Sequence, residues 1–299
     1  MSADRPGRLG VGVVGMGHVG PVIASALRAA GHSVVGVSAG SAVSRERAEV
    51  MLPGVPVLDV ERRVERCELV VLAVPDDQLG PLVQGLADLH AWQGGQLVAH
   101  TSGAHGIRVL EPARRQGAIP LAIHPAMTFT GTSVDVARLV GTPFAVTAPG
   151  PVLPIAQALV VELGGEPVVV AEDRRALYHA ALAHGANHLV TLEVQAQRAL
   201  AAAGVEDPGM FMRPLLEASL DRVSREGEAG LSGPVARGDA GTVAHHIRAL
   251  LGAEGLDDIA DTYSQMTRAT VRMLLDSGRV SQRSATEILA ALTLGEGPD

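Results

Sequence analysis

The chain contains no lysine: all 24 of its basic residues are arginine. Schiff-base catalysis, pyridoxal phosphate anchoring and a phosphate-binding P-loop each require a lysine, so these are excluded. A dehydrogenase mechanism in which a lysine ammonium polarises the substrate carbonyl is excluded for the same reason. The function must depend on other polar groups.

Cysteine and aromatic residues are also scarce. The single cysteine, Cys67, excludes an intramolecular disulfide, and its place before an apolar run predicts a small buried thiol rather than a nucleophile. Aromatic residues make up 2% of the chain, so Val, Leu, Ile and Ala must fill the core. No apolar stretch approaches the roughly 18 residues of a membrane span, and no signal peptide is recognisable. We therefore expect a cytoplasmic protein.

Clustered positive charge is missing as well. The net charge is −8, with acidic and basic residues mixed along the chain. Nucleic acids and anionic membranes are bound by basic patches, so neither is expected as a partner. With 299 residues, 47% of them apolar, the chain is long enough for two domains.

Short apolar runs alternate with helical patterns over the first 170 residues, which is typical of βαβ units and a parallel sheet. The runs are rich in Val and do not alternate with polar residues, as a sheet covered on both faces requires. The expected strands are residues 9–14, 33–37, 55–57, 69–74, 96–100, 118–123, 144–147 and 168–170, and the expected helices are 19–30, 45–52, 60–67, 79–89, 107–115 and 152–163.

Strand signals stop after Glu172. Residues 174–203 predict one long helix, and further helices are expected at 209–223, 239–251, 258–275 and 281–294. The sequence therefore predicts an α/β fold: a Rossmann domain with a doubly wound parallel sheet in residues 1–171, followed by an all-α domain in residues 172–299.

A glycine-rich loop joins the first expected strand to the first expected helix. In a Gly-x-Gly-x-x-Gly loop the first glycine permits a tight turn, the second lets the backbone approach a pyrophosphate, and the third lets the helix pack close to the strand. Strand, loop, helix and second strand follow at the required distances. The expected dinucleotide-binding residues are Gly15, Met16, Gly17, His18, Val19 and Gly20. The alternative is a glycine-rich turn without a ligand.

The end of the second strand bears on the choice between NAD and NADP. NAD-binding domains carry an acidic residue there, whereas this chain has Ser38, Ser41, Ser44 and Arg45. Hydroxyl and guanidinium groups suit the 2′-phosphate of NADP, because arginine binds phosphate bidentately. We expect NADP(H) as cofactor and no metal. The alternative is that Ser44 is only a helix N-cap and Arg45 is solvated.

Three further strand ends are expected at the same carboxyl edge of the sheet. Val74 and Pro75 are expected to form a wall of the cofactor site. Ser102, in a turn, either orients the substrate or only caps the next helix. His124 is a candidate proton donor, its alternative role being to hold the loop by a backbone hydrogen bond. Thr128, four residues later, is an expected substrate contact.

Polar residues of the helical half complete the expected site. Asn187 shares a helix face with Ala183, which leaves room for a nicotinamide while the amide orients a carbonyl or imine; the alternative is a structural link. His179 is either an interface histidine or a substrate contact. Arg237, in a glycine-rich loop before the N-cap Asp239, either holds a substrate carboxylate or pairs with an acid at an interface.

Six segments together resemble a bacterial family of Rossmann-like proteins with a C-terminal domain known as domain of unknown function 2520. They are GVVGMGHVG (12–20), VPDDQL (74–79), HTSGAHG (100–106), HPAMTFTG (124–131), YHAALAHGANH (178–188) and LSGPVARGD (231–239). The resemblance implies an NADP-binding fold similar to that of 6-phosphogluconate dehydrogenase, pyrroline-5-carboxylate reductase and ketopantoate reductase. It also implies a homodimer formed through the helical domain, and some members are associated with ketopantoate reduction in pantothenate biosynthesis.

Two details of the resemblance concern mechanism. Hydroxyacid dehydrogenases of this superfamily carry a lysine one turn before an asparagine that matches Asn187, but the lysine position is Ala183 here. Their mechanism therefore does not transfer directly. The His-Pro-Ala-Met segment at His124 resembles the His-Pro-Met loop of prephenate dehydrogenases, whose histidine contacts the substrate hydroxyl.

The expected function is an NADPH-dependent reductase of a small 2-oxo acid, with 2-dehydropantoate as the first candidate. His124 would supply the proton, Asn187 and Ser102 would orient the oxygen, and Arg237 would bind the carboxylate. We then expect the rate to fall as the pH rises through the range in which histidine titrates, because the protonated His124 that donates the proton is lost. The alternatives are a cyclic imine reductase, a prephenate-type dehydrogenase and a non-catalytic NADP-binding redox sensor.

Overall fold

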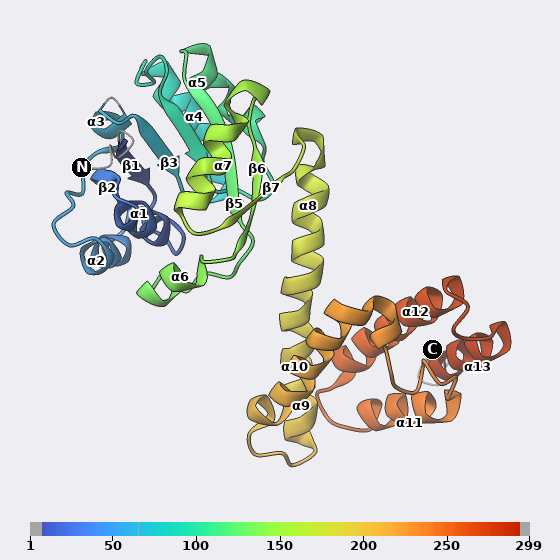
Figure 1. The fold of residues 1–299 in the computed structure, drawn as a ribbon. Coiled ribbons are helices and arrows are strands. Elements are labelled where there is room, and N and C mark those ends of the chain that lie inside the picture. Colours follow the sequence, from blue (N-terminus) through green and yellow to red (C-terminus); the bar gives the residue numbers. More distant parts are fainter. Residues whose placement is uncertain (1–7, 65, 294–299) are drawn as a thin grey trace, which may run out of the picture. The chain divides into compact units, whose positions relative to one another are not determined.

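The computed structural model describes residues 8–64 and 66–293. The chain divides into two compact units, Met1–Gly185 and Ala186–Asp299 (Figure 1). The first seven residues and the end of the last expected helix, Leu294, lie outside the described residues. None of the helices in the described ranges is long and apolar enough to cross a membrane.

A seven-stranded sheet forms the centre of the first unit, with the strand order β2-β1-β3-β4-β5-β6-β7. The strands are β1 (Gly10–Val14), β2 (Ser33–Ser38), β3 (Leu69–Leu72), β4 (Leu97–His100), β5 (Ile119–Pro125), β6 (Pro143–Thr147) and β7 (Glu166–Val169). The expected strand at 55–57 forms only an isolated bridge between Val37 and Val57. Every other expected strand is confirmed.

The sheet is parallel from β2 to β5 and reverses at β6. β5 and β6 pair antiparallel, while β6 and β7 pair parallel. The connection from β5 to β6 contains the six-residue helix α6 (Ser133–Arg138), which the sequence analysis did not anticipate. The sheet is therefore mostly parallel, as predicted, and only β6 and β7 run against the direction of the other strands.

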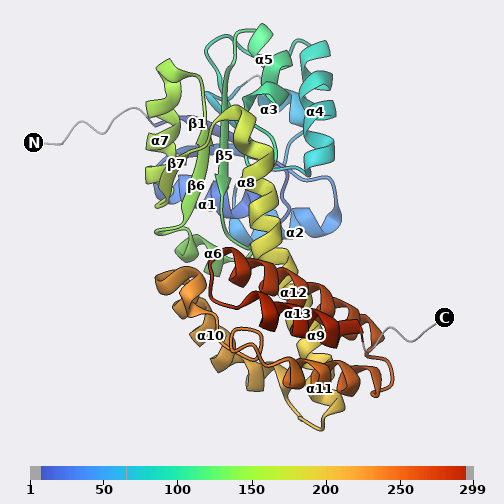
Figure 2. The same cartoon turned by 90° about the vertical axis from the view of Figure 1, so that its right-hand side faces the viewer.

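Helices cover both faces of this sheet, as the uninterrupted Val-rich strands require. The helices of the first unit are α1 (Gly20–Ala29), α2 (Ala42–Met51), α3 (Val60–Val64), α4 (Asp76–Asp88), α5 (Glu111–Arg115), α6, α7 (Leu153–Glu162) and α8 (Arg175–Leu182), with 3-10 helices η1 (Ile107–Leu110), η2 (Gly150–Val152) and η3 (Glu172–Arg174). Val11 and Val13 belong to the buried cluster that includes residues of α1 and α7, whereas Val14 belongs to the cluster that includes residues of α4. Figure 2 shows α7 and α4 on opposite sides of the sheet.

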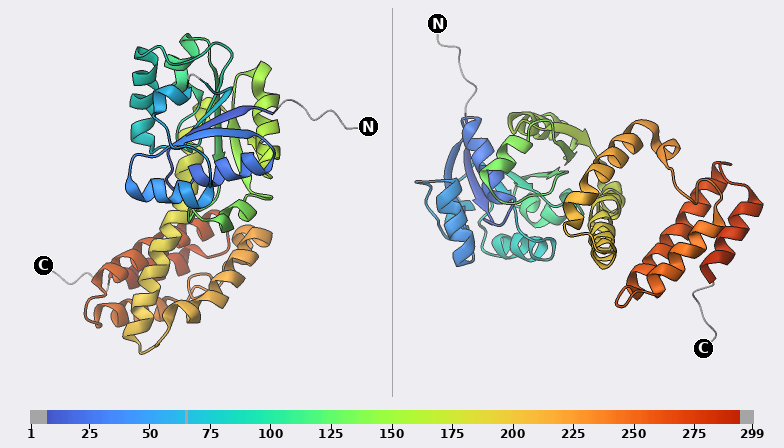
Figure 3. Two further views of the ribbon diagram at one scale, coloured as in Figure 1. Left: turned by 90° about the vertical axis from the view of Figure 1, so that its left-hand side faces the viewer. Right: turned by 90° about the horizontal axis from the view of Figure 1, so that it is seen from below.

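Helices are the regular secondary structure of the second unit in its described residues. It contains α9 (His188–Ala202), α10 (Pro208–Glu226), the 3-10 helix η5 (Gly227–Gly230), α11 (Ala240–Leu251), α12 (Asp257–Asp276) and α13 (Gln282–Leu292). α11, α12 and α13 pack against one another around Val243, Ile247, Val271, Leu274 and Ile288 (Figure 3). The predicted order of a doubly wound α/β sheet followed by a helical region is confirmed.

The expected helix 174–203 is continuous but changes its winding near the middle. α8 passes into a π-helical turn, η4 (Ala183–Asn187), which then continues as α9. The division between the two compact units falls inside this turn, after Gly185. Asn187 is the last residue of the π turn.

Candidate functional site

The glycine-rich loop has one glycine that the chain's own packing does not require. Gly15 has a φ of +98°, and a Cβ there would overlap the carbonyl oxygen of Ala73. A Cβ on Gly20 would overlap the carbonyl oxygen of Gly15. A Cβ on Gly17 would meet no described atom within 4 Å. The open space at Gly17 is the room that a pyrophosphate in close approach to the backbone would take.

The remaining loop residues divide between core and surface. The Met16 side chain is 1% exposed and packs in the core, so only its backbone can face a ligand. His18 is exposed and Val19 is half-buried. α1 begins at Gly20, and no side chain of the described residues caps its N-terminus. Pro21 has no N–H, and the N–H groups of Val22 and Ile23 both donate to the Val19 carbonyl at 3.1 Å. An anion here would therefore meet the positive end of the helix dipole and the loop amides before α1.

The end of β2 carries a capping box. Ser41 is the N-cap of α2: its Oγ accepts the Ser44 N–H at 3.1 Å, and the Ser44 Oγ accepts the Ser41 N–H at 2.9 Å. The alternative that Ser44 is the N-cap is therefore wrong, because the helix begins one turn earlier than expected. Ser38 ends β2 and its carbonyl accepts the Gly15 N–H at 3.1 Å. Arg45 is exposed in the first turns of α2.

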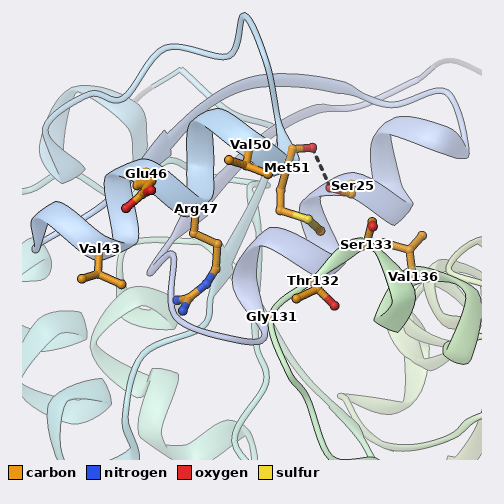
Figure 4. Close-up of a pocket in the computed structure, with 10 residues that line it drawn as sticks. All are labelled: Ser25, Val43, Glu46, Arg47, Val50, Met51, Gly131, Thr132, Ser133 and Val136. Carbon is orange, nitrogen blue, oxygen red and sulfur yellow. Dashed lines mark hydrogen bonds between the residues drawn. The ribbon is translucent and has the colours of Figure 1, made fainter.

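A second arginine of α2, which the sequence analysis missed, contacts the glycine-rich loop. Arg47 Nη1 donates to the carbonyl oxygens of Met16 at 3.3 Å and Gly17 at 3.0 Å. Figure 4 shows Arg47 reaching from α2 into a pocket of about 640 Å³ that Gly131 and Thr132 also line. Arg47 follows Ser44 by three residues and so lies on the same helix face. This spacing is the sequence feature from which a contact between Arg47 and the loop could have been predicted.

The other cofactor wall expected from sequence lies beside the loop. A Val74 methyl carbon is 3.2 Å from the position of a Cβ on Gly15. Pro75 is exposed and precedes α4, whose first turn contains Asp76 and Asp77. Acidic residues stabilise the first turn of a helix, so both aspartates have a structural role in α4.

Three ring side chains meet near the carboxyl ends of β4 and β5. His124 Nδ1 lies 2.8 Å from the hydroxyl oxygen of Tyr178, and the two rings are edge to face. The His179 ring centroid lies 6.3 Å from that of His124. A Cβ on Gly103 would lie 2.9 Å from His124 Nε2 and 2.8 Å from His179 Cδ2. The loop after β4, the end of β5 and the first turns of α8 thus form one cluster, in which Tyr178 was not anticipated.

The protonation state of this cluster differs from the expectation. Burial, the charge of Arg175 and the neighbouring His179 lower the pKa of His124 to about 4, against a small opposing effect of Asp76. A pKa of about 4 leaves His124 neutral at neutral pH, which favours a neutral proton donor over the charged imidazolium acid expected from the sequence. Burial raises the pKa of Tyr178, so the phenol keeps its proton.

In the loop after β4, Ser102 closes a turn and does not cap the next helix, η1, whose N-cap is Gly106; its substrate role stays a prediction. Ser102 is buried, and its Oγ accepts the His105 N–H at 3.1 Å. Its own N–H donates to His100 Nδ1 at 3.2 Å, so the proton of the neutral ring sits on Nε2, which donates to the Gly106 carbonyl at 2.8 Å. Burial lowers the pKa of His100 to about 4.

The remaining expected site residues are at the surface. Thr128 is exposed in the loop after β5 of the first unit. Asn187 and Arg237 are exposed residues of the second unit. Asp239 is the N-cap of α11, as expected, and accepts the Thr242 N–H at 3.0 Å.

Two family models match most of the chain. Residues 1–125 match a Rossmann-like domain, and residues 142–270 match a Domain of unknown function (DUF2520). Among curated proteins, none matches this sequence.

Solved structures similar to this chain span both units. Protein BF3122 from Bacteroides fragilis, provisionally described as an NADP oxidoreductase, aligns with a TM-score of 0.73 at 20% identity over 88% of this chain and 98% of its own. Protein TM1727 from Thermotoga maritima aligns with a TM-score of 0.64 at 22% identity, over 90% of this chain and 100% of its own. An imine reductase from Myxococcus stipitatus, solved with NADP+, aligns with a TM-score of 0.63 at 17% identity, over 94% of this chain and 99% of its own. At these identities the likeness concerns the fold.

Proposed function

The chain belongs to the family that joins a Rossmann-like domain to domain of unknown function 2520, and from this premise we propose that it is an NADPH-dependent oxidoreductase that reduces a carbonyl group. A small 2-oxo acid is the proposed substrate class, with 2-dehydropantoate as the first compound to test. The observation that carries the proposal is the 2.8 Å hydrogen bond between His124 and Tyr178.

The position of this pair in the sheet supports the proposal. Val14, Leu72, His100 and Ala122 are level with one another across β1, β3, β4 and β5. The glycine-rich loop after β1 and the cluster around His124 therefore open on the same carboxyl edge. The strand order reverses beside β1, and ligands of doubly wound sheets bind at such a reversal.

The residues of the loop region suit a dinucleotide phosphate. The open space at Gly17 and the N-terminus of α1 suit the pyrophosphate. Arg47 holds the loop by its carbonyl oxygens, so that the loop amides face away from α2. Ser41 and Arg45 at the start of α2 are proposed to meet the 2′-phosphate. Bound NADPH would supply a hydride to the substrate carbon.

The hydrogen bond between His124 and Tyr178 supplies a route for the proton. When His124 carries its proton on Nδ1, it donates to the Tyr178 oxygen and leaves the Tyr178 O–H free to donate to the substrate oxygen. The Tyr178 O–H bond then breaks, Tyr178 regains a proton from His124 Nδ1, and His124 Nε2 takes one from solvent. His124 is neutral before and after, in agreement with its low pKa.

A second candidate function is reduction of a cyclic imine. It is favoured by the fold likeness to the Myxococcus stipitatus imine reductase. The same proton route would serve an amine nitrogen, so the cluster alone does not separate the two substrates. The substrate roles of Asn187 and Arg237 remain predictions from the sequence.

The experiment is an NADPH absorbance assay with a panel of 2-oxo acids and cyclic imines, run beside NADPH titration by calorimetry. The proposal expects turnover of at least one 2-oxo acid. Turnover of imines alone would replace it with the second candidate. Tight NADPH binding with no consumption across the panel would contradict both and favour a sensor.

We also propose a homodimer formed through the helical unit, as the family resemblance implies. α9 and α10 contain no buried residue. Apolar side chains of α10 lie open, with Phe211 64% and Leu215 61% exposed. Large apolar side chains that lie exposed together on one helix are typical of a protein interface. Light scattering should give twice the chain mass, and the double variant Phe211→Ser, Leu215→Ser should shift it to the monomer.

A further inference from the structure

The first residue of α8 is a fully buried arginine. The Arg175 side chain is 1% exposed. Its Nε donates to Thr147 Oγ1 at 2.8 Å, its Nη2 donates to the carbonyl oxygens of Ala122 and Ala145 at 3.0 Å each, and its Nη1 donates to the Ser102 carbonyl at 3.4 Å. One guanidinium thus joins α8 to β5, to β6 and to the loop after β4.

Within the described residues, these partners leave the charge of Arg175 without a hydrogen-bonded counter-ion. All of its hydrogen-bond partners in the described part of the chain are neutral oxygens. The nearby carboxylate of Glu172 instead accepts the N–H groups of Ile107 at 2.6 Å and Arg108 at 3.1 Å. A buried charge is usually paired. Arg175 therefore places a positive charge without a hydrogen-bonded carboxylate beneath this edge of the sheet, and the nearby charge of Glu172 opposes the fall that burial causes in the pKa of Arg175.

Two members of the cluster around His124 belong to the same helix as Arg175. Tyr178 and His179 follow Arg175 by three and four residues, so they share a helix face with it. The hydrogen bonds of Arg175 fix that face against the sheet at the point where Tyr178 reaches His124. Any shift of this first turn would move the Tyr178 hydroxyl away from His124 Nδ1.

Both neighbours of Arg175 respond to its charge in the same direction. Its charge lowers the pKa of His124 and opposes the rise that burial causes in the pKa of Tyr178. The titratable and charged groups that face His124 are Arg175, Tyr178 and His179 of α8 and Asp76 at the start of α4. Of these, Arg175 is the one fixed positive charge.

We propose that Arg175 is a positioning residue that fixes Tyr178 against His124, and that its unpaired charge selects substrates that become negative during reduction. A carbonyl that takes up a hydride becomes an alkoxide, which a neighbouring positive charge stabilises. An iminium ion is already positive and is disfavoured by the same charge. This inference rests on the proposed function and names the substrate class: a carbonyl compound rather than a cationic imine.

The test uses variants of the full chain and a readout that needs no turnover. Arg175→Met removes the charge, and Arg175→Lys keeps the charge but lacks the planar guanidinium group that makes several hydrogen bonds at once. Arg174→Met is the control, because it changes the exposed neighbour that pairs with Asp173. The titration of His124 is followed by NMR of the histidine-labelled proteins. Arg175→Met should raise the pKa of His124, whereas Arg174→Met should leave it unchanged. An unchanged His124 titration in folded Arg175→Met overturns the inference.

The second measurement is the ratio of kcat/KM for the best carbonyl to that for the best imine. Arg175→Met should lower this ratio at least tenfold, and Arg175→Lys should keep it within about threefold of the wild type, because its charge remains. If Arg175→Met does not fold, a tenfold fall of the ratio in Arg175→Lys overturns the charge effect. A protein that reduces neither substrate contradicts the proposed function, while the NMR titration still decides the effect of Arg175.

Discussion

The hydroxyl oxygen of Tyr178 lies 2.8 Å from Nδ1 of His124, although 54 residues separate them in the chain. β5 supplies the histidine and the first turn of α8 supplies the tyrosine. Both groups are neutral at neutral pH, because burial lowers the pKa of His124 and raises that of Tyr178. A pair of neutral groups transfers a proton without creating a buried charge, which would be costly at this depth.

Removing either partner should slow the reaction without loosening the cofactor. His124→Asn and Tyr178→Phe should each keep NADPH affinity and lower kcat on the order of a hundredfold, the usual effect of losing a proton donor. Tyr263→Phe is the matched control, since Tyr263 makes a 2.9 Å hydrogen bond to His246 in the second unit. Steady-state kinetics with NADPH titration checks this, and a normal kcat in Tyr178→Phe would remove Tyr178 from the proton route.

The dependence of kcat on pH should show no change in the range in which a histidine usually titrates. Because the pKa of His124 is about 4, His124 does not change charge near neutral pH. The wild-type kcat should therefore stay level from about pH 6 to about pH 8, instead of falling as an imidazolium acid would require. A fall in kcat with rising pH that disappears in His124→Asn would show that the histidine acts in its charged form.

The two arginines of α2 should affect the cofactors differently. NADP should bind at least roughly tenfold tighter than NAD, or about 1.4 kcal/mol. Arg45→Ala should erase most of that preference and leave NAD binding nearly unchanged. Arg47→Ala should weaken NADP and NAD alike, because Arg47 holds the carbonyl oxygens of Met16 and Gly17. Calorimetry with both cofactors measures this. If Arg47→Ala alone removes the preference for NADP, the assignment of Arg45 is wrong.

Stability should fall on acidification because His100 is buried in its neutral form. Its pKa is lowered from 6.5 to about 4, so between these values the unfolded chain binds a proton that the folded protein does not. The unfolding free energy should therefore decrease as the pH falls through this window. The contribution of His100 is fully present above pH 6.5 and amounts to roughly 3 kcal/mol. Denaturant titrations at several pH values measure it, and His100→Gln should flatten the slope. An undiminished slope in His100→Gln would assign the effect to other groups.

Much of the fold could be predicted from the sequence because its signals are local. The Val-rich runs, the glycine-rich loop and the cap Asp239 each depend on neighbouring residues, and the structure has them as expected. The reversal at β6 was missed because an apolar run predicts a buried strand but does not show in which direction that strand runs in the sheet. The cap of α2 was misplaced because Ser41 and Ser44 are both good N-caps, and only the backbone decides between them.

The candidate site was less predictable, since its main features arise between distant segments. Ser102, His124 and His179 could be singled out by type and position, but the role of Tyr178 depends on a contact between β5 and α8. Arg175 looks like any charged residue at a helix start until its burial is known. The neutral state of His124 likewise follows from burial and from that charge, neither of which the sequence displays.

The central claim, that this chain reduces a carbonyl with NADPH, is tested most directly by one single-turnover measurement. Excess protein is loaded with NADPH that carries deuterium at the transferred position and is mixed with 2-dehydropantoate and, separately, with other small 2-oxo acids. The proposal predicts oxidation of the bound NADPH and a product alcohol with deuterium on the former carbonyl carbon. Bound NADPH that stays reduced with every 2-oxo acid, in a protein that binds it tightly, would contradict the claim.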